Sequence, residues 1–269
     1  MTQKKIHFIG GGQMAEAIIR ASIAKGTLSA DQISVSDINE ARLQLLKAKY
    51  SVNTESSQEQ GLSAAELIVI AVRPQDDLNA LGQIVQQFAS PTATVVSIVA
   101  GVTIEKLGGY FGTERPITRV IPNTLTDTGY GYSGVALNAY VIRDQVEDFL
   151  LGFGKVQYLE ESYIDIFTGF GVAGPNYIYY FIESFVDAGV LAGLPREQAW
   201  KVALENMMGA VMMLQQTGLH PRQLLDINNS PGGVGMHGLY ELNNSDFAAG
   251  LQRSVLAAVK RTTELGVKE

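Results

Sequence analysis

The chain has 269 residues, a formal net charge of −7 and no cysteine. The negative charge argues against non-specific nucleic-acid binding, which needs a basic face. The lack of cysteine excludes disulfides, thiolate metal ligands and a cysteine nucleophile.

Length and patterning place the chain among globular proteins of one large or two domains. No apolar stretch approaches the ~18 residues that span a bilayer, so we expect no membrane segment. The N-terminus lacks a signal-peptide pattern, which together with the absence of cysteine predicts a cytoplasmic protein. Its three histidines (His7, His220 and His237) lie far apart in the sequence, so we expect no catalytic metal site.

Residues 4–15, KKIHFIGGGQMA, predict a strand, a glycine turn and the start of a helix. This is the context that the dinucleotide-binding fingerprint requires. Read as G-x-G-x-x-A, the fingerprint residues are Gly10, Gly12 and Ala15. Gly10 permits the tight turn, Gly12 lets a pyrophosphate approach the backbone, and Ala15 lets the helix pack close to the strand. The helix N-terminus then offers free N–H groups to the phosphates.

Strands and helices alternate through the rest of the first half. Strands are expected at 33–37, 51–53, 66–72, 94–99, 117–121, 131–137 and 155–159. Helices are expected at 39–49, 58–62, 74–88, from 104, and at 143–151. This alternation predicts a parallel, doubly wound (Rossmann) sheet. Residues 1–161 are therefore expected to form an α/β dinucleotide-binding domain.

The pattern changes near Ser162, after which we expect helices only. Helices are predicted at 175–192, from Pro195, and at 247–265. Tyrosines spread apolar surface around the first of these helices, and a helix that is apolar on most sides is buried on most sides. Residues 162–269 are therefore predicted to form an all-α domain that binds substrate and associates as a homodimer or larger homo-oligomer.

Asp37 ends the second predicted strand, some 20-odd residues after the glycines. An acidic residue there accepts hydrogen bonds from the adenosine ribose and disfavours a 2′-phosphate, which predicts NAD(P)H binding with NADH favoured. Two alternatives stay open. Asp37 has the simpler role of capping the helix from Asn39, and Arg42 is near enough in sequence to bind a 2′-phosphate.

Other site residues are expected where the remaining strands end, because ligands bind at the carboxyl edge of open α/β sheets. Asn123 is one of them, and it is equally suited to a turn. The residues predicted to contact the cofactor are Gly10, Gly12, Gln13, Met14, Ala15, Asp37, Val72, Arg73, Pro74, Ala100, Gly101 and Asn123.

A second glycine-rich segment, residues 230–235 (SPGGVG), lies between predicted helices. Its backbone N–H groups suit a small carboxylate, and the alternative is a plain connector. The predicted substrate-binding residues are Ser230, Gly232, Gly233 and Gly235. His237 is the ionisable side chain near this loop that could donate a proton; its alternative is a first-turn helix residue at an interface.

Six segments of the chain resemble, in order, those of pyrroline-5-carboxylate reductases. They are IGGGQMAEAII, AVRPQ, SIVAGVTIEKL, RVIPNT, GPNYIYYFIESFVDAGVLAGLPR and NSPGG. The resemblance covers essentially the whole chain and implies NAD(P)H-dependent reduction of the cyclic imine 1-pyrroline-5-carboxylate to proline. It implies dimerisation through interlocking C-terminal helices, often within a larger ring. It also implies that the partner subunit's SPGG loop holds the substrate carboxylate.

The chain departs from the family's usual pattern on the expected substrate side. Gly235 stands where SPGG-x-T has its threonine, Ala173 and Asn176 alter the usual SGSGPAY, and IPNTL at 121–125 replaces MPNTP. Losing one hydroxyl to a charged group costs about 1.5–3 kcal/mol. Our hypothesis is that cofactor use is retained and substrate preference has shifted.

Several alternatives follow. Gly235 and Ala173 enlarge the expected site, which favours a paralogue that reduces a six-membered piperideine-carboxylate. A decayed substrate site would leave a non-catalytic, dinucleotide-binding regulatory protein. A β-hydroxyacid dehydrogenase needs a lysine on the long helix, and residues 156–200 contain none. Imine reduction itself demands no strong general acid, because a cyclic imine is partly protonated near neutral pH.

Overall fold

The computed structural model describes residues 4–55 and 58–267. Its contacts divide the chain into two compact units. The first unit joins the residues up to Ala173 with those from Ala257 onward, and the second is Gly174–Leu256.

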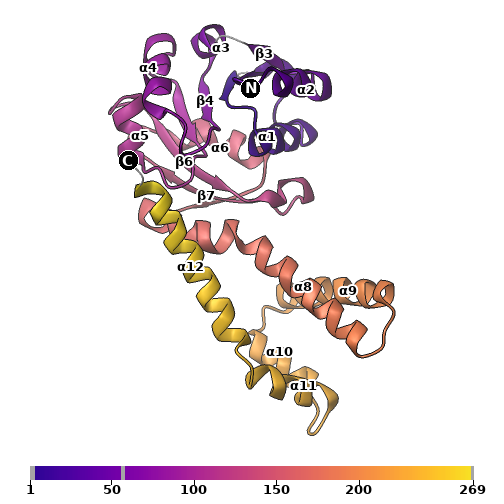
Figure 1. The fold of residues 1–269 in the computed structure, drawn as a ribbon. Coiled ribbons are helices and arrows are strands. Elements are labelled where there is room, and N and C mark those ends of the chain that lie inside the picture. Colours follow the sequence, from indigo (N-terminus) through magenta and orange to yellow (C-terminus); the bar gives the residue numbers. More distant parts are fainter. Residues whose placement is uncertain (1–3, 56–57, 268–269) are drawn as a thin grey trace. The chain divides into compact units, whose positions relative to one another are not determined.

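The first unit is built on an eight-stranded sheet of order β3-β2-β1-β4-β5-β6-β7-β8 (Figure 1). The strands are β1 (Ile6–Ile9), β2 (Ile33–Ser36), β3 (Asn53–Glu55), β4 (Leu67–Ile70), β5 (Thr94–Ser97), β6 (Ile117–Pro122), β7 (Tyr132–Leu137) and β8 (Lys155–Tyr158). The first six strands are parallel, so their carboxyl ends meet at one edge. The predicted doubly wound α/β architecture is confirmed for this part of the chain.

The sheet is not parallel throughout, because β7 runs antiparallel to β6. The connection at 123–131 holds a 3₁₀ turn, η2 (Thr124–Thr128). It is too short for the dozen or more residues that a parallel crossover needs, so the chain returns alongside β6 in the opposite direction. β8 then pairs with β7 in parallel after a crossover through α6 (Arg143–Gly152).

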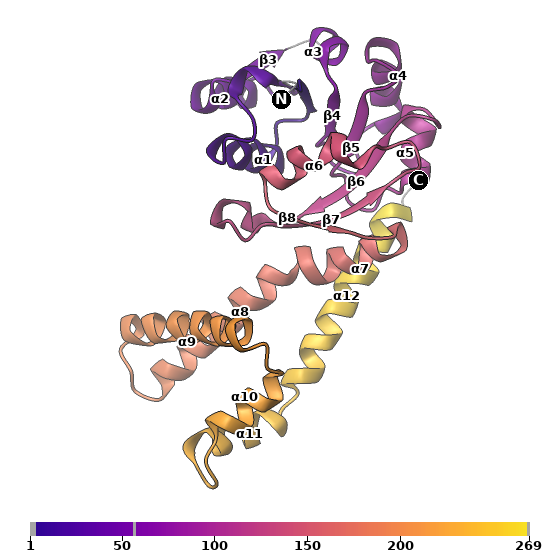
Figure 2. The same cartoon turned by 180° about the vertical axis from the view of Figure 1, so that it is seen from behind.

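Helices cover both faces of the sheet. Phe8 points into the core formed with α1 (Gln13–Ala24), α2 (Glu40–Tyr50) and α6. Figure 2 shows these three helices from behind. Ile9 points to the opposite core, with α3 (Glu59–Ala64), α4 (Leu78–Phe88) and α5 (Ile104–Phe111). This alternation follows from the strand period of two, and it buries β1 on both faces.

The helix expected to open at Pro74 begins four residues later, at Leu78. The backbone first makes a turn in which the Asp76 N–H donates to the Arg73 carbonyl at 3.0 Å. Asp77 then caps α4, its side chain accepting from the Ala80 N–H at 2.9 Å. Aspartate is among the strongly preferred N-cap residues, and here it sets the start of the helix.

The division into units differs from the boundary expected at 161/162. Residues 164–172, which form α7 (Ile164–Phe167) and a π-helical turn η4 (Thr168–Val172), group with the sheet. Ile164 is fully buried in a small cluster with Ile121 and Ala136 of β6 and β7. The last turns of α12 (Phe247–Val267) also group with the first unit, where Val259 packs against Gly169.

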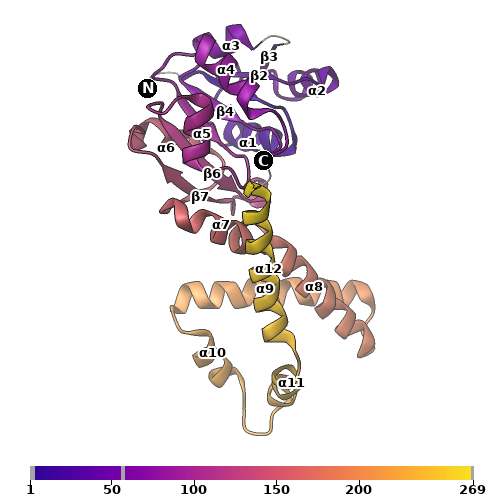
Figure 3. The same ribbon diagram turned by 60° about the vertical axis from the view of Figure 1, so that its left-hand side comes forward.

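The second unit contains helices and connections but no strand (Figure 3). Its helices are α8 (Gly174–Leu191), α9 (Arg196–Thr217), α10 (Pro221–Asn228), α11 (Val234–Asn243) and the first half of α12. Its buried apolar cluster consists of Val186 on α8 with Ala199 and Ala203 on α9. Many large apolar side chains of α8, α9 and α11 are exposed. This unit therefore buries little of its own apolar surface.

Candidate active site

The glycine turn after β1 has the geometry that the fingerprint predicted. Gly10 has φ +100°, and a Cβ there would lie 2.5 Å from the Ala71 carbonyl oxygen. Because that oxygen belongs to rigid backbone beside β4, only glycine fits. The close contact between Gly10 and Ala71 places the glycine turn directly beside the carboxyl end of β4.

Gly12 shapes the open side of this turn. It is the N-cap of α1, and within the described part of the chain no side chain caps the helix. A Cβ at Gly12 would meet nothing within 4 Å, so the space in front of the helix N-terminus is open. The first-turn N–H groups, including those of Gln13 and Met14, therefore point into a cradle that fits a pyrophosphate. These residues fit a dinucleotide cofactor.

Asp37 follows β2 and is tied to the same turn. Its Oδ2 accepts from the Gly11 N–H at 2.6 Å, and its Oδ1 accepts from the Asn39 N–H at 2.7 Å. Each carboxylate oxygen retains a second acceptor direction, which suits ribose hydroxyls. The alternative in which Asp37 caps α2 is wrong, because Asn39 is the N-cap and its own side chain accepts from the Arg42 N–H.

Arg42 lies in the first turn of α2 and points to the glycine turn. Its Nε and Nη2 donate to the Gly11 carbonyl at 2.8 and 2.6 Å, and Nη2 also donates to Glu16 at 2.7 Å. The Gly11 peptide is thus held from both sides, its N–H by Asp37 and its carbonyl by Arg42. This arrangement fixes the tip of the turn.

The other predicted cofactor residues lie at the same carboxyl edge of the sheet. Arg73 is exposed and pairs with Asp76 at 2.8 Å, which raises the pKa of the guanidinium through that hydrogen bond. Ala100 and Gly101 follow β5, and Gly101 has φ +77°. Asn123 is buried, and its Oδ1 accepts from the backbone N–H of Leu125 in the β6–β7 connection and from that of Tyr132 at the start of β7. Its turn role is therefore present in the structure.

The predicted substrate loop lies in the second unit. Gly232 has φ +68°, and a Cβ at Gly233 would lie 2.5 Å from the Ser230 Oγ. The loop therefore wraps tightly around Ser230. Gly233 is the N-cap of α11, so Gly235 lies in the first turn of that helix. His237 is exposed in the same turn.

The room expected beside Gly235 is filled. The Asn229 Oδ1 lies where a Cβ at Gly235 would have to be. This oxygen is buried with no hydrogen-bond partner among the described residues, whereas the Asn229 Nδ2 donates to the Leu225 carbonyl at 2.6 Å. The room that Gly235 was expected to add to the site, beside that from Ala173, is therefore not present at this position.

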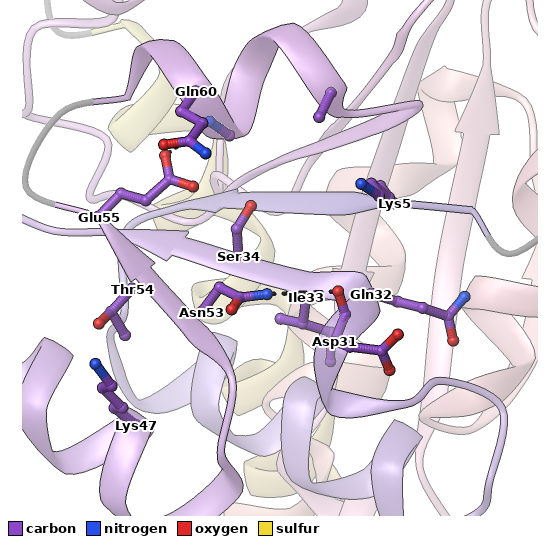
Figure 4. Close-up of a pocket in the computed structure, with 12 residues that line it drawn as sticks. Lys5, Asp31, Gln32, Ile33, Ser34, Lys47, Asn53, Thr54, Glu55 and Gln60 are labelled. Atoms are coloured by element: carbon purple, nitrogen blue, oxygen red, sulfur yellow. Dashed lines mark hydrogen bonds between the residues drawn. The ribbon is translucent and has the colours of Figure 1, made fainter.

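A separate polar cavity of about 380 Å³ lies near the amino ends of β1, β2 and β3 (Figure 4). Lys5, Asp31 and Gln32 line one side of it, and Glu55 and Gln60 line the other. None of the predicted cofactor residues is among its described lining. It is distinct from the glycine turn, which lies at the opposite edge of the sheet.

Among residues 4–55 and 58–267, no group of three or more histidine and carboxylate side chains could hold a metal ion. In the same part of the chain, no helix is long and apolar enough to cross a membrane.

Comparisons with known proteins agree with this geometry. Residues 161–265 match the family model for pyrroline-5-carboxylate reductase dimerisation, and residues 5–101 match that for NADP oxidoreductase, coenzyme F420-dependent. The pyrroline-5-carboxylate reductase of Synechocystis sp. is 34% identical, over 98% of this chain and 99% of the relative. That of Escherichia coli is 33% identical, over 98% of both chains.

The chain belongs to the pyrroline-5-carboxylate reductase family.

Solved structures of the family share the whole fold. The Plasmodium falciparum pyrroline carboxylate reductase with NADP bound is 30% identical, with a TM-score of 0.88 over 99% of both chains. The Coxiella burnetii pyrroline-5-carboxylate reductase is 28% identical, with a TM-score of 0.89 over 99% of this chain and all of that one. The resemblance expected from the six motifs is thereby confirmed for the entire chain.

Sequence reasoning overlooked three residues near the predicted sites, two in the first unit and one in the second. Ile38, directly after Asp37, is fully exposed at the carboxyl edge. Its apolar side chain after the acidic residue was the sequence signal that could have identified it as a site residue. Glu16 is buried beside Arg42, as an acidic residue on a predicted core helix can be. Asn229 fills the space beside Gly235, a contact that depends on the helix–loop geometry and leaves no mark in the sequence.

Proposed function

We propose that the protein reduces 1-pyrroline-5-carboxylate to proline with NAD(P)H. What carries the proposal is sequence identity of about one third to pyrroline-5-carboxylate reductases over nearly the whole chain. The open cradle at Gly12, which fits the cofactor, supports it. A bound reduced nicotinamide supplies the hydride that reduces the imine carbon.

The chain's own residues would bind and orient the two reactants. The N–H groups at the start of α1 hold the pyrophosphate, and Asp37 accepts from the adenosine ribose. Ile38 offers an exposed apolar surface for the adenine. Six further residues lie at the same carboxyl edge of the sheet and would contact the nicotinamide end of the cofactor. They are Val72, Arg73, Pro74, Ala100, Gly101 and Asn123.

Substrate binding is assigned to the loop before α11. The Ser230 hydroxyl and the backbone N–H groups of Gly232, Gly233 and Gly235 are suited to the imino-acid carboxylate. We assign no strong general acid, because the imine nitrogen carries a proton in part of the population near neutral pH. His237 is exposed in the first turn of α11, just after this loop. It is the candidate side chain for donating a proton to the imine nitrogen.

NADH is proposed as the favoured cofactor. Asp37 places a carboxylate where a 2′-phosphate would bring further negative charge, and like charges repel. Among the relatives, the Plasmodium falciparum protein was solved with NADP bound.

Assembly as a homodimer through the second unit is also proposed. An apolar groove of about 750 Å³ lies between α8 and the start of α12, lined by Phe181, Phe185 and Leu251 among others. Such a surface on the unit that matches a dimerisation domain suits a second copy of the chain. We also propose that residues 1–161 form the dinucleotide-binding domain and that 162–269 form the dimerisation and substrate domain. A cytoplasmic location is proposed as well.

Steady-state oxidation of NADH and of NADPH tests the proposal, each with pyrroline-5-carboxylate and with piperideine-2-carboxylate. We expect turnover of the five-membered imine and a higher kcat/KM with NADH. Turnover of the six-membered imine alone would replace the proposed substrate. Cofactor binding without turnover of either imine would favour a non-catalytic, dinucleotide-binding protein.

A further inference from the structure

Glu16 is a nearly buried carboxylate, 5% exposed, one turn into α1. Its Oε2 accepts from Arg42 at 2.7 Å. Its Oε1 accepts from the Tyr50 hydroxyl at 2.9 Å and from Lys49 at 3.4 Å. Burial acts to raise the pKa of Glu16, but these hydrogen bonds outweigh it and lower the pKa, so the carboxylate is ionised at neutral pH.

Arg42 is therefore anchored at three acceptors. Besides Glu16, its guanidinium donates to the Gly11 carbonyl through both Nε and Nη2, and Nη2 donates to the Gly12 carbonyl at 3.4 Å. The side chain is 20% exposed. Turning it toward a ligand on the open side would break these bonds. Glu16 would then lose its shortest partner and keep, among the described residues, only Tyr50 at 2.9 Å, Lys49 at 3.4 Å and Arg20 at 3.8 Å.

The anchoring bears on the adenosine end of the cofactor, and this step rests on the proposed NAD(P)H-dependent function. A 2′-phosphate on the ribose bound by Asp37 would lie close to that carboxylate. Arg42, in the first turn of α2, is a cation near Asp37 that could offset the repulsion, and its Nε and Nη2 are bonded to the Gly11 carbonyl and to Glu16.

We infer that Glu16 is a specificity-determining residue, which disfavours NADPH by holding Arg42 against the Gly11 carbonyl. Asp37 repels the 2′-phosphate. Glu16 keeps Arg42 bonded away from the phosphate, so Arg42 does not offset this repulsion. The preference thus depends on a side chain that touches no part of the cofactor.

The test measures dissociation constants for NADH and NADPH by the fluorescence of the reduced nicotinamide. Glu16→Gln keeps the shape of the side chain and removes its charge. We expect the NADPH to NADH affinity ratio to rise about tenfold, the size of one hydrogen bond to a charged group. Glu16→Gln/Arg42→Ala should lose this gain, because Arg42 supplies it.

Two controls keep the inference falsifiable. Lys49→Gln removes another cation beside Glu16 that does not contact Gly11, so the ratio should stay within about twofold of wild type. Arg42→Lys keeps the charge but lacks the planar fork that donates twice to the Gly11 carbonyl. Arg42→Lys should therefore raise the NADPH to NADH affinity ratio, and it serves as the test if Glu16→Gln does not fold. Thermal unfolding shows whether each variant is folded.

Three results would overturn the inference. The first is a folded Glu16→Gln protein, or a folded Arg42→Lys protein, whose ratio is unchanged. The second is a gain that persists in the double variant. The third is a tenfold loss of NADPH affinity in Arg42→Ala alone, since Arg42 would then already bind the phosphate. Failure of the proposed function would be seen in the wild type, as an absence of imine turnover or of any dinucleotide binding. It is therefore distinguishable from failure of this inference.

Discussion

His7 lies on β1 with its ring fully buried between two hydroxyls of β2. Its Nδ1 lies 2.8 Å from the Ser34 Oγ, and its Nε2 lies 3.1 Å from the Ser36 Oγ. Burial lowers the pKa of His7 from 6.5 to about 4. The ring is therefore neutral in the folded protein at pH 7 and takes no part in the cofactor edge.

This shift predicts a pH-dependent stability. Below pH 6.5 the unfolded chain binds a proton at His7, whereas the folded chain does not until about pH 4. The contribution of His7 is thus fully present above pH 6.5 and is lost as the pH falls toward 4, by up to about 3 kcal/mol. Urea unfolding at pH 8, 6 and 4.5 should show a shallower decline for His7→Gln than for wild type. Equal slopes would mean that His7 is not the responsible group.

At the scale of elements, the β1–turn–α1 unit was predictable because its signal is local. Three glycines after a β-prone run specify the turn, and Gly10 adopts the positive φ that only glycine tolerates well. The Arg42 bond to the Gly11 carbonyl was not predictable, since the two residues are 31 positions apart. The start of α4 was missed although its signal was local: Asp77 is a strong N-cap residue, and we gave more weight to Pro74.

Gly10 and Gly12 form a matched pair for testing this turn. Gly10→Ala should lower the free energy of unfolding by about 2 kcal/mol or more, because it combines an unfavourable φ with a backbone clash. Gly12→Ala meets open space, so its cost should stay below about 1 kcal/mol, the preference of an N-cap position for glycine over alanine.

The second substitution should nevertheless weaken NADH binding about tenfold, because a methyl group in the cradle costs a phosphate hydrogen bond of about 1.5–3 kcal/mol. Chemical denaturation and fluorescence titration measure the two effects. Unchanged NADH affinity in Gly12→Ala would remove the pyrophosphate from this position.

At the scale of the whole molecule, the two units differ in how much apolar surface they bury themselves. The first has two cores, one on each face of the sheet. The second has a cluster of three buried residues and a wide apolar groove. The sequence indicated this contrast, because helices apolar on most sides need a partner. It could not indicate that residues 164–172 pack on the sheet, since this depends on contacts with β6 and β7.

A charge in the groove should therefore disrupt association. Ile178 lines it and is 56% exposed, so Ile178→Asp should shift the protein toward monomer. Ile142 in the first unit is exposed to a similar extent, 60%, and Ile142→Asp should leave the assembly intact. Sedimentation velocity distinguishes the two. A dimeric Ile178→Asp protein would place the interface elsewhere.

The contact between Asn229 and Gly235 couples the effects of substitutions at these two positions. Adding a side chain at 235 forces the Asn229 carboxamide to rotate and to give up its bond to the Leu225 carbonyl, a loss of about 1 kcal/mol. A threonine at 235 should therefore cost less in a chain whose position 229 carries a smaller side chain, and the effects of substitutions at the two positions should not add.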